Sequence, residues 1–209
     1  MDIQFYGANC LVITVQGVRV VIDDNLKELG AKSVIRSEDI ALFTSKATEI
    51  PVDTKLMIDC PGEYEVSALS IYGIPARSHM DTEEQMTGTM YKIIVDDMSV
   101  LVTGHIFPKL SDNQLEKIGI VSTLIIPVGG NGYTLDAIDA LSIIKEIEPK
   151  VVIPTHYDDQ GLKYPIPQQT LEQALKGLAV DVSQTVQKFK LKPNDLREDN
   201  LQLVVLEKS

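Results

Sequence analysis

The chain has no tryptophan, and aromatic residues make up only 5% of its 209 positions. Its core must therefore be built mainly from isoleucine, valine and leucine, and a hydrophobic content of 44% is sufficient for this. A chain of this length buries roughly 70% of the surface that its unfolded form exposes. We expect one globular domain over residues 1–209.

Cysteine is scarce, and positive charge is outnumbered by negative charge. The two cysteines, Cys10 and Cys60, form no Cys-x-x-Cys pair, which excludes a zinc ribbon and favours two reduced, largely buried thiols. The net charge of −11 argues against a protein that binds nucleic acid by neutralising phosphates. The ordinary interpretation of this charge is solubility.

Long apolar runs are also missing. The first residues have no basic segment followed by an apolar one, so no signal peptide is expected. No apolar run approaches the ~18 residues of a membrane span. These features predict a cytoplasmic protein without a membrane partner. A small-molecule ligand and a homo-oligomer remain open as partners.

Short β-branched segments separated by glycine, proline and aspartate predict a strand-rich first half. Hairpin turns are expected at Gln16-Gly17 and Asp96-Asp97, and the polar residues 78–87 should form a loop. The expected strands cover residues 3–6, 11–15, 18–23, 40–44, 56–59, 64–66, 69–74, 89–95 and 99–103.

Strands and helices alternate in the second half. Ser111 is a good helix N-cap, Thr134 is expected to cap a helix that runs to Glu148, and residues 168–178 form a third helix. The expected strands cover residues 123–128, 151–154 and 201–206. This order of elements suggests an α/β protein with helices on both outer faces of two stacked sheets, a four-layer αββα arrangement.

Several blocks of sequence also carry a family resemblance. They are residues 5–10 (FYGANC), 21–24 (VIDD), 61–66 (PGEYEV), 125–130 (IIPVGG) and 147–157 (IEPKVVIPTHY). Together they resemble the metallo-β-lactamase superfamily, in its small lactonase-like branch related to ascorbate-6-phosphate lactonase. The resemblance implies the αββα fold. In active relatives two metal ions hold a hydroxide that attacks a lactone, amide or phosphoester.

The first metal-binding segment of that family differs here. Relatives carry Thr-His-x-His-x-Asp-His, where this chain reads TSKATEI over residues 44–50. By the resemblance, Ser45, Ala47 and Ile50 replace histidines. Glu49 replaces the aspartate.

A second segment differs as well. The family's His-Leu-Gly-Asp corresponds to residues 102–105, where Val102 replaces the histidine and His105 the bridging aspartate. His156 is retained. We infer from these differences that the two-metal centre is lost, that no cofactor is bound, and that the protein is a non-catalytic or repurposed binding or regulatory member.

The alternative is an enzyme with a rebuilt site. His79, His105 and His156 would hold one zinc or manganese ion, because three imidazoles with an open position suit water activation. Glu49 or Asp23 would act as the base for hydrolysis of a lactone or phosphoester. Each histidine also has an ordinary explanation without a metal. His156 would be an inherited residue that is hydrogen-bonded in a closed pocket, and His105 would fill space beside it. His79 would lie exposed in a loop.

Residues 129–132 (GGNG) precede the helix expected at Thr134 and resemble a phosphate-binding loop. The P-loop lysine is absent, however. A tight turn at the rim of the pocket explains the same glycines and is favoured.

Overall fold

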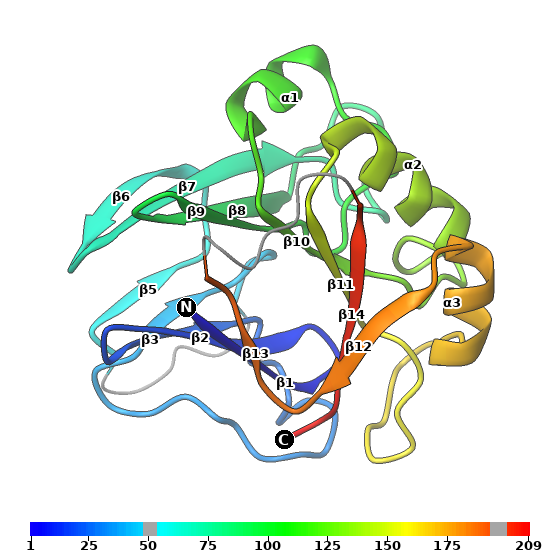
Figure 1. The fold of residues 1–209 in the computed structure, drawn as a ribbon, viewed down its shortest axis with the longest axis horizontal. Helices are drawn as coiled ribbons and strands as arrows, with labels where there is room; N and C mark the ends of the chain where they lie inside the picture. The colour runs from blue at the N-terminus through cyan, green and yellow to red at the C-terminus, as the bar shows by residue number, and fades with distance from the viewer. Residues whose placement is uncertain (48–53, 193–199) are drawn as a thin grey trace.

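The computed structural model describes residues 1–47, 54–192 and 200–209. Within these ranges the strands form two sheets that share one apolar core (Figure 1). Sheet A consists of β1 (Asp2–Gly7), β2 (Cys10–Val15), β3 (Val18–Ile22), β4 (Ile40–Leu42), β5 (Leu56–Ile58) and β13 (Phe189–Lys190). Sheet B consists of β6 (Gly62–Val66), β7 (Leu69–Ala76), β8 (Gly88–Val95), β9 (Met98–Val102), β10 (Thr123–Pro127), β11 (Val151–Thr155), β12 (Val182–Val186) and β14 (Gln202–Leu206).

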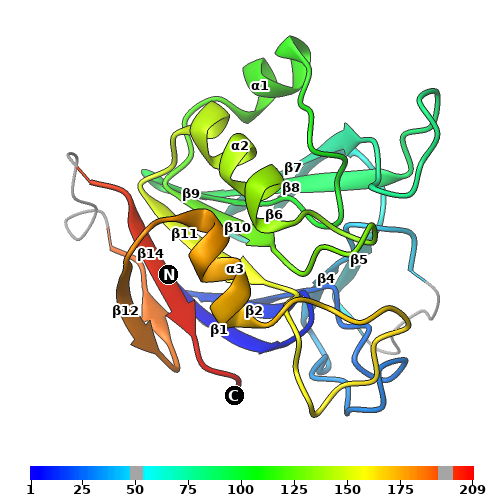
Figure 2. The same ribbon diagram turned by 90° about the vertical axis from the view of Figure 1, so that its right-hand side faces the viewer.

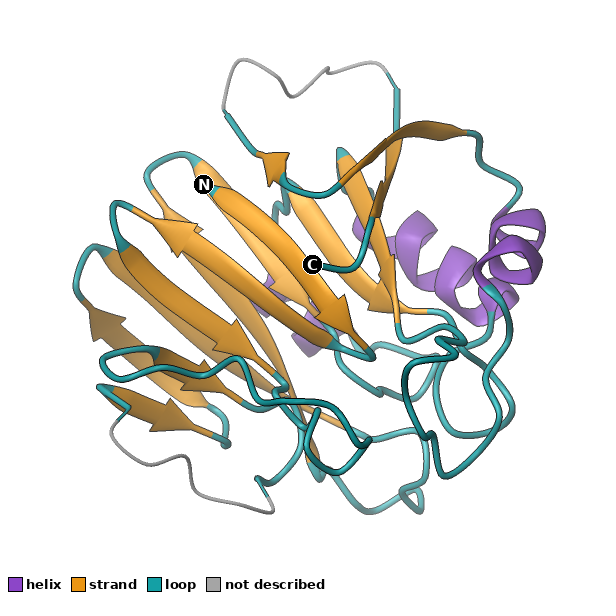
Figure 3. Cartoon of the chain, turned by 90° about the horizontal axis from the view of Figure 1, so that it is seen from below, coloured by secondary structure: helices purple, strands orange, loops and turns teal. Residues whose placement is uncertain are grey.

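The two sheets combine hairpins with parallel strands. The strand order is β13-β1-β2-β3-β4-β5 in sheet A and β12-β14-β11-β10-β9-β8-β7-β6 in sheet B. β3, β4 and β5 run parallel to one another, as do β9, β10 and β11. The carboxyl ends of parallel strands meet at the same edge of a sheet, so the loops that follow them gather there (Figure 3).

The core between the sheets is aliphatic, as the composition predicts. Ile13 of sheet A and Ile71 and Ile93 of sheet B are fully buried in it. Tyr91 is also fully buried, and its hydroxyl donates to the carbonyl oxygen of Ile58 across the sheets at 3.3 Å. The hairpin turn at Gln16-Gly17 is confirmed, since both residues adopt positive φ angles of 49° and 84°.

Three helices lie among the described residues, and all pack on the outer face of sheet B (Figure 2). They are α1 (Asp112–Ile118), α2 (Ala137–Ile147) and α3 (Leu171–Leu178). Ser111 caps α1 as predicted, in a capping box with Gln114. α3 starts at Leu171, after its cap Thr170, and so begins later than residue 168.

The predicted cap of α2 is wrong. Asp136, not Thr134, is the N-cap, because its carboxylate accepts hydrogen bonds from the backbone N–H groups of Ile138 and Asp139 at 2.8 and 2.9 Å. Thr134 is buried two residues earlier. Glu148 follows the helix as a left-handed C-cap with φ 52°.

The outer face of sheet A is covered differently from the prediction. Leu26 and Leu162 pack there on Val12 and Val21, from segments that form turns and no helix in the described chain. The fold class is confirmed as mixed α/β with two stacked sheets, but irregular chain replaces the helical layer expected over sheet A. Gly30, at φ 83°, interrupts this segment.

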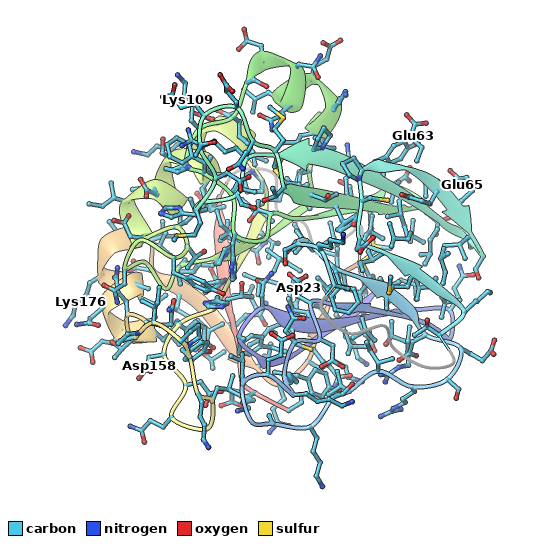
Figure 4. All side chains as sticks on the ribbon, turned by 180° about the vertical axis from the view of Figure 1, so that it is seen from behind. Asp23, Glu63, Glu65, Lys109, Asp158 and Lys176 are labelled. Atoms are coloured by element: carbon cyan, nitrogen blue, oxygen red, sulfur yellow. The ribbon has the colours of Figure 1, made fainter. Side chains whose placement is uncertain are left out.

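The edges of sheet B are polar. β12 carries no clear strand pattern in the sequence, because its five residues, VSQTV, are mostly exposed and lack an apolar face. At the other edge, Glu63 and Glu65 of β6 point outward on the same side (Figure 4). Cys60, just before β6, is exposed, which corrects the expectation of two buried thiols, while Cys10 is buried. None of the described helices is long and apolar enough to cross a membrane.

Substituting Ile93→Ala tests the shared core. Ile93 is fully buried, so we expect the free energy of unfolding to fall by about 2–5 kcal/mol. Ile120→Ala is the matched control, because Ile120 is 87% exposed and its loss should change stability by no more than about 0.5 kcal/mol. Urea unfolding followed by circular dichroism measures both, and equal effects would contradict the assignment of the core.

Candidate functional site

A cavity of about 280 Å³ lies at the edge where the loops gather. It is bounded by the chain that follows β1, β3, β4, β9, β10 and β11, so both sheets contribute to it. Its lining is Ala8, Asn9, Asp23, Asn25, Glu28, Leu29, Thr44, Ser45, His105, Tyr133, His156, Lys163, Tyr164 and Pro165.

A buried hydrogen-bond network forms the floor of the cavity. It is centred on Asp23, which Figure 4 labels. The carboxylate of Asp23 accepts from the side-chain amide of Asn9 at 2.5 Å, and from the backbone N–H and hydroxyl of Thr44, both at 2.6 Å. Asn9 in turn accepts from the hydroxyl of Thr155 at 2.7 Å. The network joins the ends of β3 and β4 in sheet A to the end of β11 in sheet B.

The environment of Asp23 acts on its pKa in two directions. Burial raises the pKa by disfavouring the charged form, and the hydrogen bonds from Thr44 and Asn9 lower it, with a net upward shift. Since three donors already occupy its oxygens, the carboxylate is held in place as part of the floor.

Three lining residues adopt left-handed backbone conformations. Ala8, Asp23 and His156 have φ angles of 50°, 47° and 52°. Such conformations cost of order 1–3 kcal/mol each and cluster at functional sites. The backbone N–H of His156 donates to the carbonyl oxygen of Ala8 at 2.7 Å, which fixes two of these strained residues against each other.

Gly104 lets the chain after β9 pass directly against the floor. It has φ 64°, and a Cβ atom there would collide with the side chain of Thr44. His105 follows at once and is thereby brought to the cavity.

Four rings form one wall. The centroids of His105 and His156 are 4.3 Å apart, with the rings perpendicular at 89°. Tyr133 lies 5.0 Å from His105, and Tyr164 lies 5.2 Å from His156. The two tyrosines and two histidines therefore make a continuous aromatic surface.

His156 is buried, with 4% of its surface exposed. Its Nδ1 lies 3.3 Å from Oε1 of Gln168, whose Nε2 donates to the carbonyl oxygen of Ile166 at 2.6 Å. Burial lowers the pKa of His156 to about 4, while hydrogen bonds, including the one to Gln168, act in the opposite direction. Burial also lowers the pKa of His105 well below its usual value, and the positive forms of His156 and His79 lower it further. Both imidazoles are thus neutral at pH 7.

The structure brings together His105, His156 and Asp23 but not His79. The backbone N–H of His79 donates to the carbonyl oxygen of His105 at 2.7 Å, yet its ring stands beside Phe107, 6.3 Å between centroids, and does not line the cavity. Glu49 lies outside the described residues. In the part of the chain that the structure describes, no group of three or more histidine, cysteine, aspartate or glutamate side chains is placed to hold a metal ion.

Two positions at which the resemblance expects metal-binding histidines carry other side chains in the structure. Ser45, where the resemblance expects a histidine, lines the cavity with a hydroxyl. Val102 is fully buried in the core between the sheets and has no donor atom.

The phosphate-loop alternative for residues 129–132 also lacks support. The first amides of α2 are bonded to the Asp136 carboxylate. A Cβ atom on Gly129 would collide with Gln168 and with the backbone of His156. This glycine is therefore explained by close packing beside the cavity.

Sequence reasoning missed Asn9, Tyr133, Tyr164 and Gln168. Asn9 was visible only as part of the FYGANC block. The others lie in loops that follow β10 and β11, and only the expectation that loops after parallel strands converge would have drawn attention to them.

Residues 2–156 match the family described as the beta-lactamase superfamily domain. The chain belongs to this family. A metal-dependent hydrolase of Carboxydothermus hydrogenoformans is 43% identical over 44 residues, which is 21% of this chain and 19% of that protein, so the match spans about a fifth of the relative's length.

Solved structures agree with the fold. A Thermotoga maritima protein, named for the zinc-dependent hydrolases of the metallo-β-lactamase superfamily, has a TM-score of 0.75 at 22% identity and covers 99% of this chain and 98% of its own. A Parabacteroides distasonis protein, named as a metal-dependent hydrolase, has a TM-score of 0.68 at 14% identity, with 99% and 93% covered. At these identities the likeness shows the shared fold.

Gly104→Ala tests the close approach to Thr44. We expect a loss of more than about 2 kcal/mol in the free energy of unfolding, because the methyl group would collide with Thr44 and φ is positive. Gly17→Ala is the matched control: its φ of 84° is also positive, but nothing lies within 4 Å, so only the backbone cost of about 1–2 kcal/mol applies. Equal losses in urea unfolding would show that the contact contributes nothing.

The lowered pKa of His156 predicts a dependence of stability on pH. Between pH 6.5 and about 4 the unfolded chain binds a proton at His156, whereas the folded protein does not. The free energy of unfolding is therefore highest above pH 6.5 and decreases as the pH falls toward 4. Relative to His156→Gln, the wild type should lose about 2 kcal/mol between pH 7 and pH 5. Paired denaturant titrations measure this, and a constant difference between the two proteins would refute it.

Proposed function

We propose that this member of the beta-lactamase superfamily is a binding protein that keeps the family's cavity for a small molecule and no longer uses two-metal hydrolysis. It belongs, on this proposal, to the lactonase-like branch that the sequence blocks resemble. The observation that carries the proposal concerns two positions at which the resemblance expects metal-binding histidines. Ser45 lines the cavity with only a hydroxyl, and Val102 is buried in the core and has no donor atom.

The shape and chemistry of the cavity support a ligand. Its volume is close to the lower limit for small-molecule sites, and its wall combines aromatic faces with a few polar groups. The strained backbone at Ala8, Asp23 and His156 is maintained around this cavity at a cost in stability. No cofactor is part of the proposal, and the ligand would bind directly to protein groups.

A hydrolase with a single zinc or manganese ion is the second candidate. The contact between His105 and His156 favours it, because two neutral imidazoles side by side are good donors for these metals. His79 would have to swing away from Phe107 to complete the site. Asp23 or Glu49 would be the base for hydrolysis of a lactone or phosphoester.

Metal content separates the two candidates. We expect substantially less than one zinc or manganese per chain, by inductively coupled plasma mass spectrometry, in tag-free protein purified without chelator and incubated with zinc. His105→Ala and His156→Ala should not change this value. About one metal ion per wild-type chain, lost in both variants, would overturn the proposal and support the single-metal hydrolase.

A further inference from the structure

Most polar groups on the cavity floor are already bonded to other protein groups. The side-chain amide of Asn9 donates to Asp23 and its oxygen accepts from Thr155, and the hydroxyl of Thr44 donates to Asp23. The hydroxyl of Tyr164 donates to the carbonyl oxygen of Tyr157 at 3.0 Å. Tyr164 therefore presents the cavity with its ring rather than with its hydroxyl proton.

Gln168 decides which nitrogen of His156 carries the proton. The carbonyl oxygen of Ile166 can only accept, so the NH₂ group of Gln168 is directed to it and Oε1 faces the imidazole. Oε1 can only accept as well, so Nδ1 of His156 must donate. In the neutral ring, Nε2 then has a lone pair and no proton. His156 lines the cavity, and Nε2 is the hydrogen-bond acceptor that its ring can offer to a ligand.

The charges around the cavity also favour a ligand that donates hydrogen bonds, and in particular a positively charged one. Asp23 belongs to the floor of the cavity, and Glu28 also lines it. Burial raises the pKa of the Tyr133 phenol, and the nearby negative charge of Glu28 raises it further. Among the described lining residues Lys163 carries the positive charge, and its side chain is exposed to solvent. Faces of aromatic rings also attract cations.

We propose that the ligand of this cavity is a small protonated amine. Its N–H groups would donate to Nε2 of His156, its charge would be balanced by Asp23 and Glu28, and its body would lie against Tyr133 and Tyr164. This inference rests on the proposed binding function and names the class of ligand. The cavity has about the volume of nine water molecules, which suits a compact amine.

Isothermal titration with benzylamine and benzyl alcohol tests the class directly. The two probes have nearly the same shape, but only the amine is protonated at pH 7.5. We expect benzylamine to bind at least about tenfold more tightly, as one desolvated cation contact predicts. Equal affinity, tighter binding of the alcohol, or no binding of benzylamine would each overturn the inference.

Two charge variants test whether Glu28 causes the preference for benzylamine over benzyl alcohol. Glu28→Gln should reduce the ratio between the two probes severalfold. Glu63→Gln removes the same charge from exposed strand β6, away from the cavity lining, and should leave the ratio unchanged. If both variants reduce the ratio equally, the overall charge of −11 and not the cavity selects the amine, and the inference is wrong.

Gln168 is a positioning residue in this scheme, and its role has a spectroscopic test. In the wild type, ¹⁵N NMR should show His156 protonated on Nδ1. Gln168→Met keeps the length of the side chain without its acceptor, so we expect a mixture of tautomers together with weaker binding of benzylamine. A wild-type ring protonated on Nε2 would refute the acceptor role.

The outcomes separate this inference from the binding function on which it rests. The titrations use wild-type protein whose metal content has been measured. If benzyl alcohol binds as well as benzylamine, the cavity is a binding site but not one for amines. If the protein holds one zinc per chain through His105 and His156, the binding function itself fails, whatever the amine does.

Discussion

The hydrogen bonds that converge on Asp23 are the constraint on which the rest of the cavity depends. Asp23 follows β3 and Thr44 follows β4, and Asn9 connects Asp23 to Thr155 at the end of β11. Hydrogen bonds in a buried network of this kind are stronger than in water. A buried polar group that loses its partner therefore destabilises the fold. The network fixes the edges of sheets A and B relative to each other at the place where the cavity opens.

Several local features follow from that constraint. Thr44 can approach the chain after β9 only because position 104 is glycine, and this approach places His105 beside His156. His156 adopts a left-handed conformation, and its backbone N–H donates to the carbonyl oxygen of Ala8. Gln168 then holds the ring of His156 from the far side, packed against Gly129. The histidine pair is thus a consequence of how the two sheets are joined.

Much of the fold could be predicted from the sequence, because strand patterns and turn residues are local signals. The strands before Thr44 and the hairpin at Gln16-Gly17 are examples. The irregular chain that covers sheet A in place of the expected helices could not be predicted this way. Leu26 and Leu162 are buried there by contacts between distant segments and not by a repeating pattern. β12 was missed because a polar edge strand has no apolar alternation.

The site was predictable only in part for the same reason. The family resemblance directed attention to Asp23, His105 and His156, which all line the cavity. It could not reveal that the oxygens of Asp23 are occupied, or that Gln168 orients His156, because hydrogen bonds between residues far apart in the chain leave no local pattern. His79 shows the reverse case, since its position in sequence suggested a ligand while its ring packs beside Phe107.

The two glutamates of β6 have a consequence for how copies of this chain meet. An unpaired strand at the end of a sheet is a template for the same strand of another molecule. Glu63 and Glu65 project from one side of that strand, so a second copy docked edge to edge would align carboxylates with carboxylates. Electrostatic repulsion at this border therefore opposes edge-to-edge association of two copies through β6.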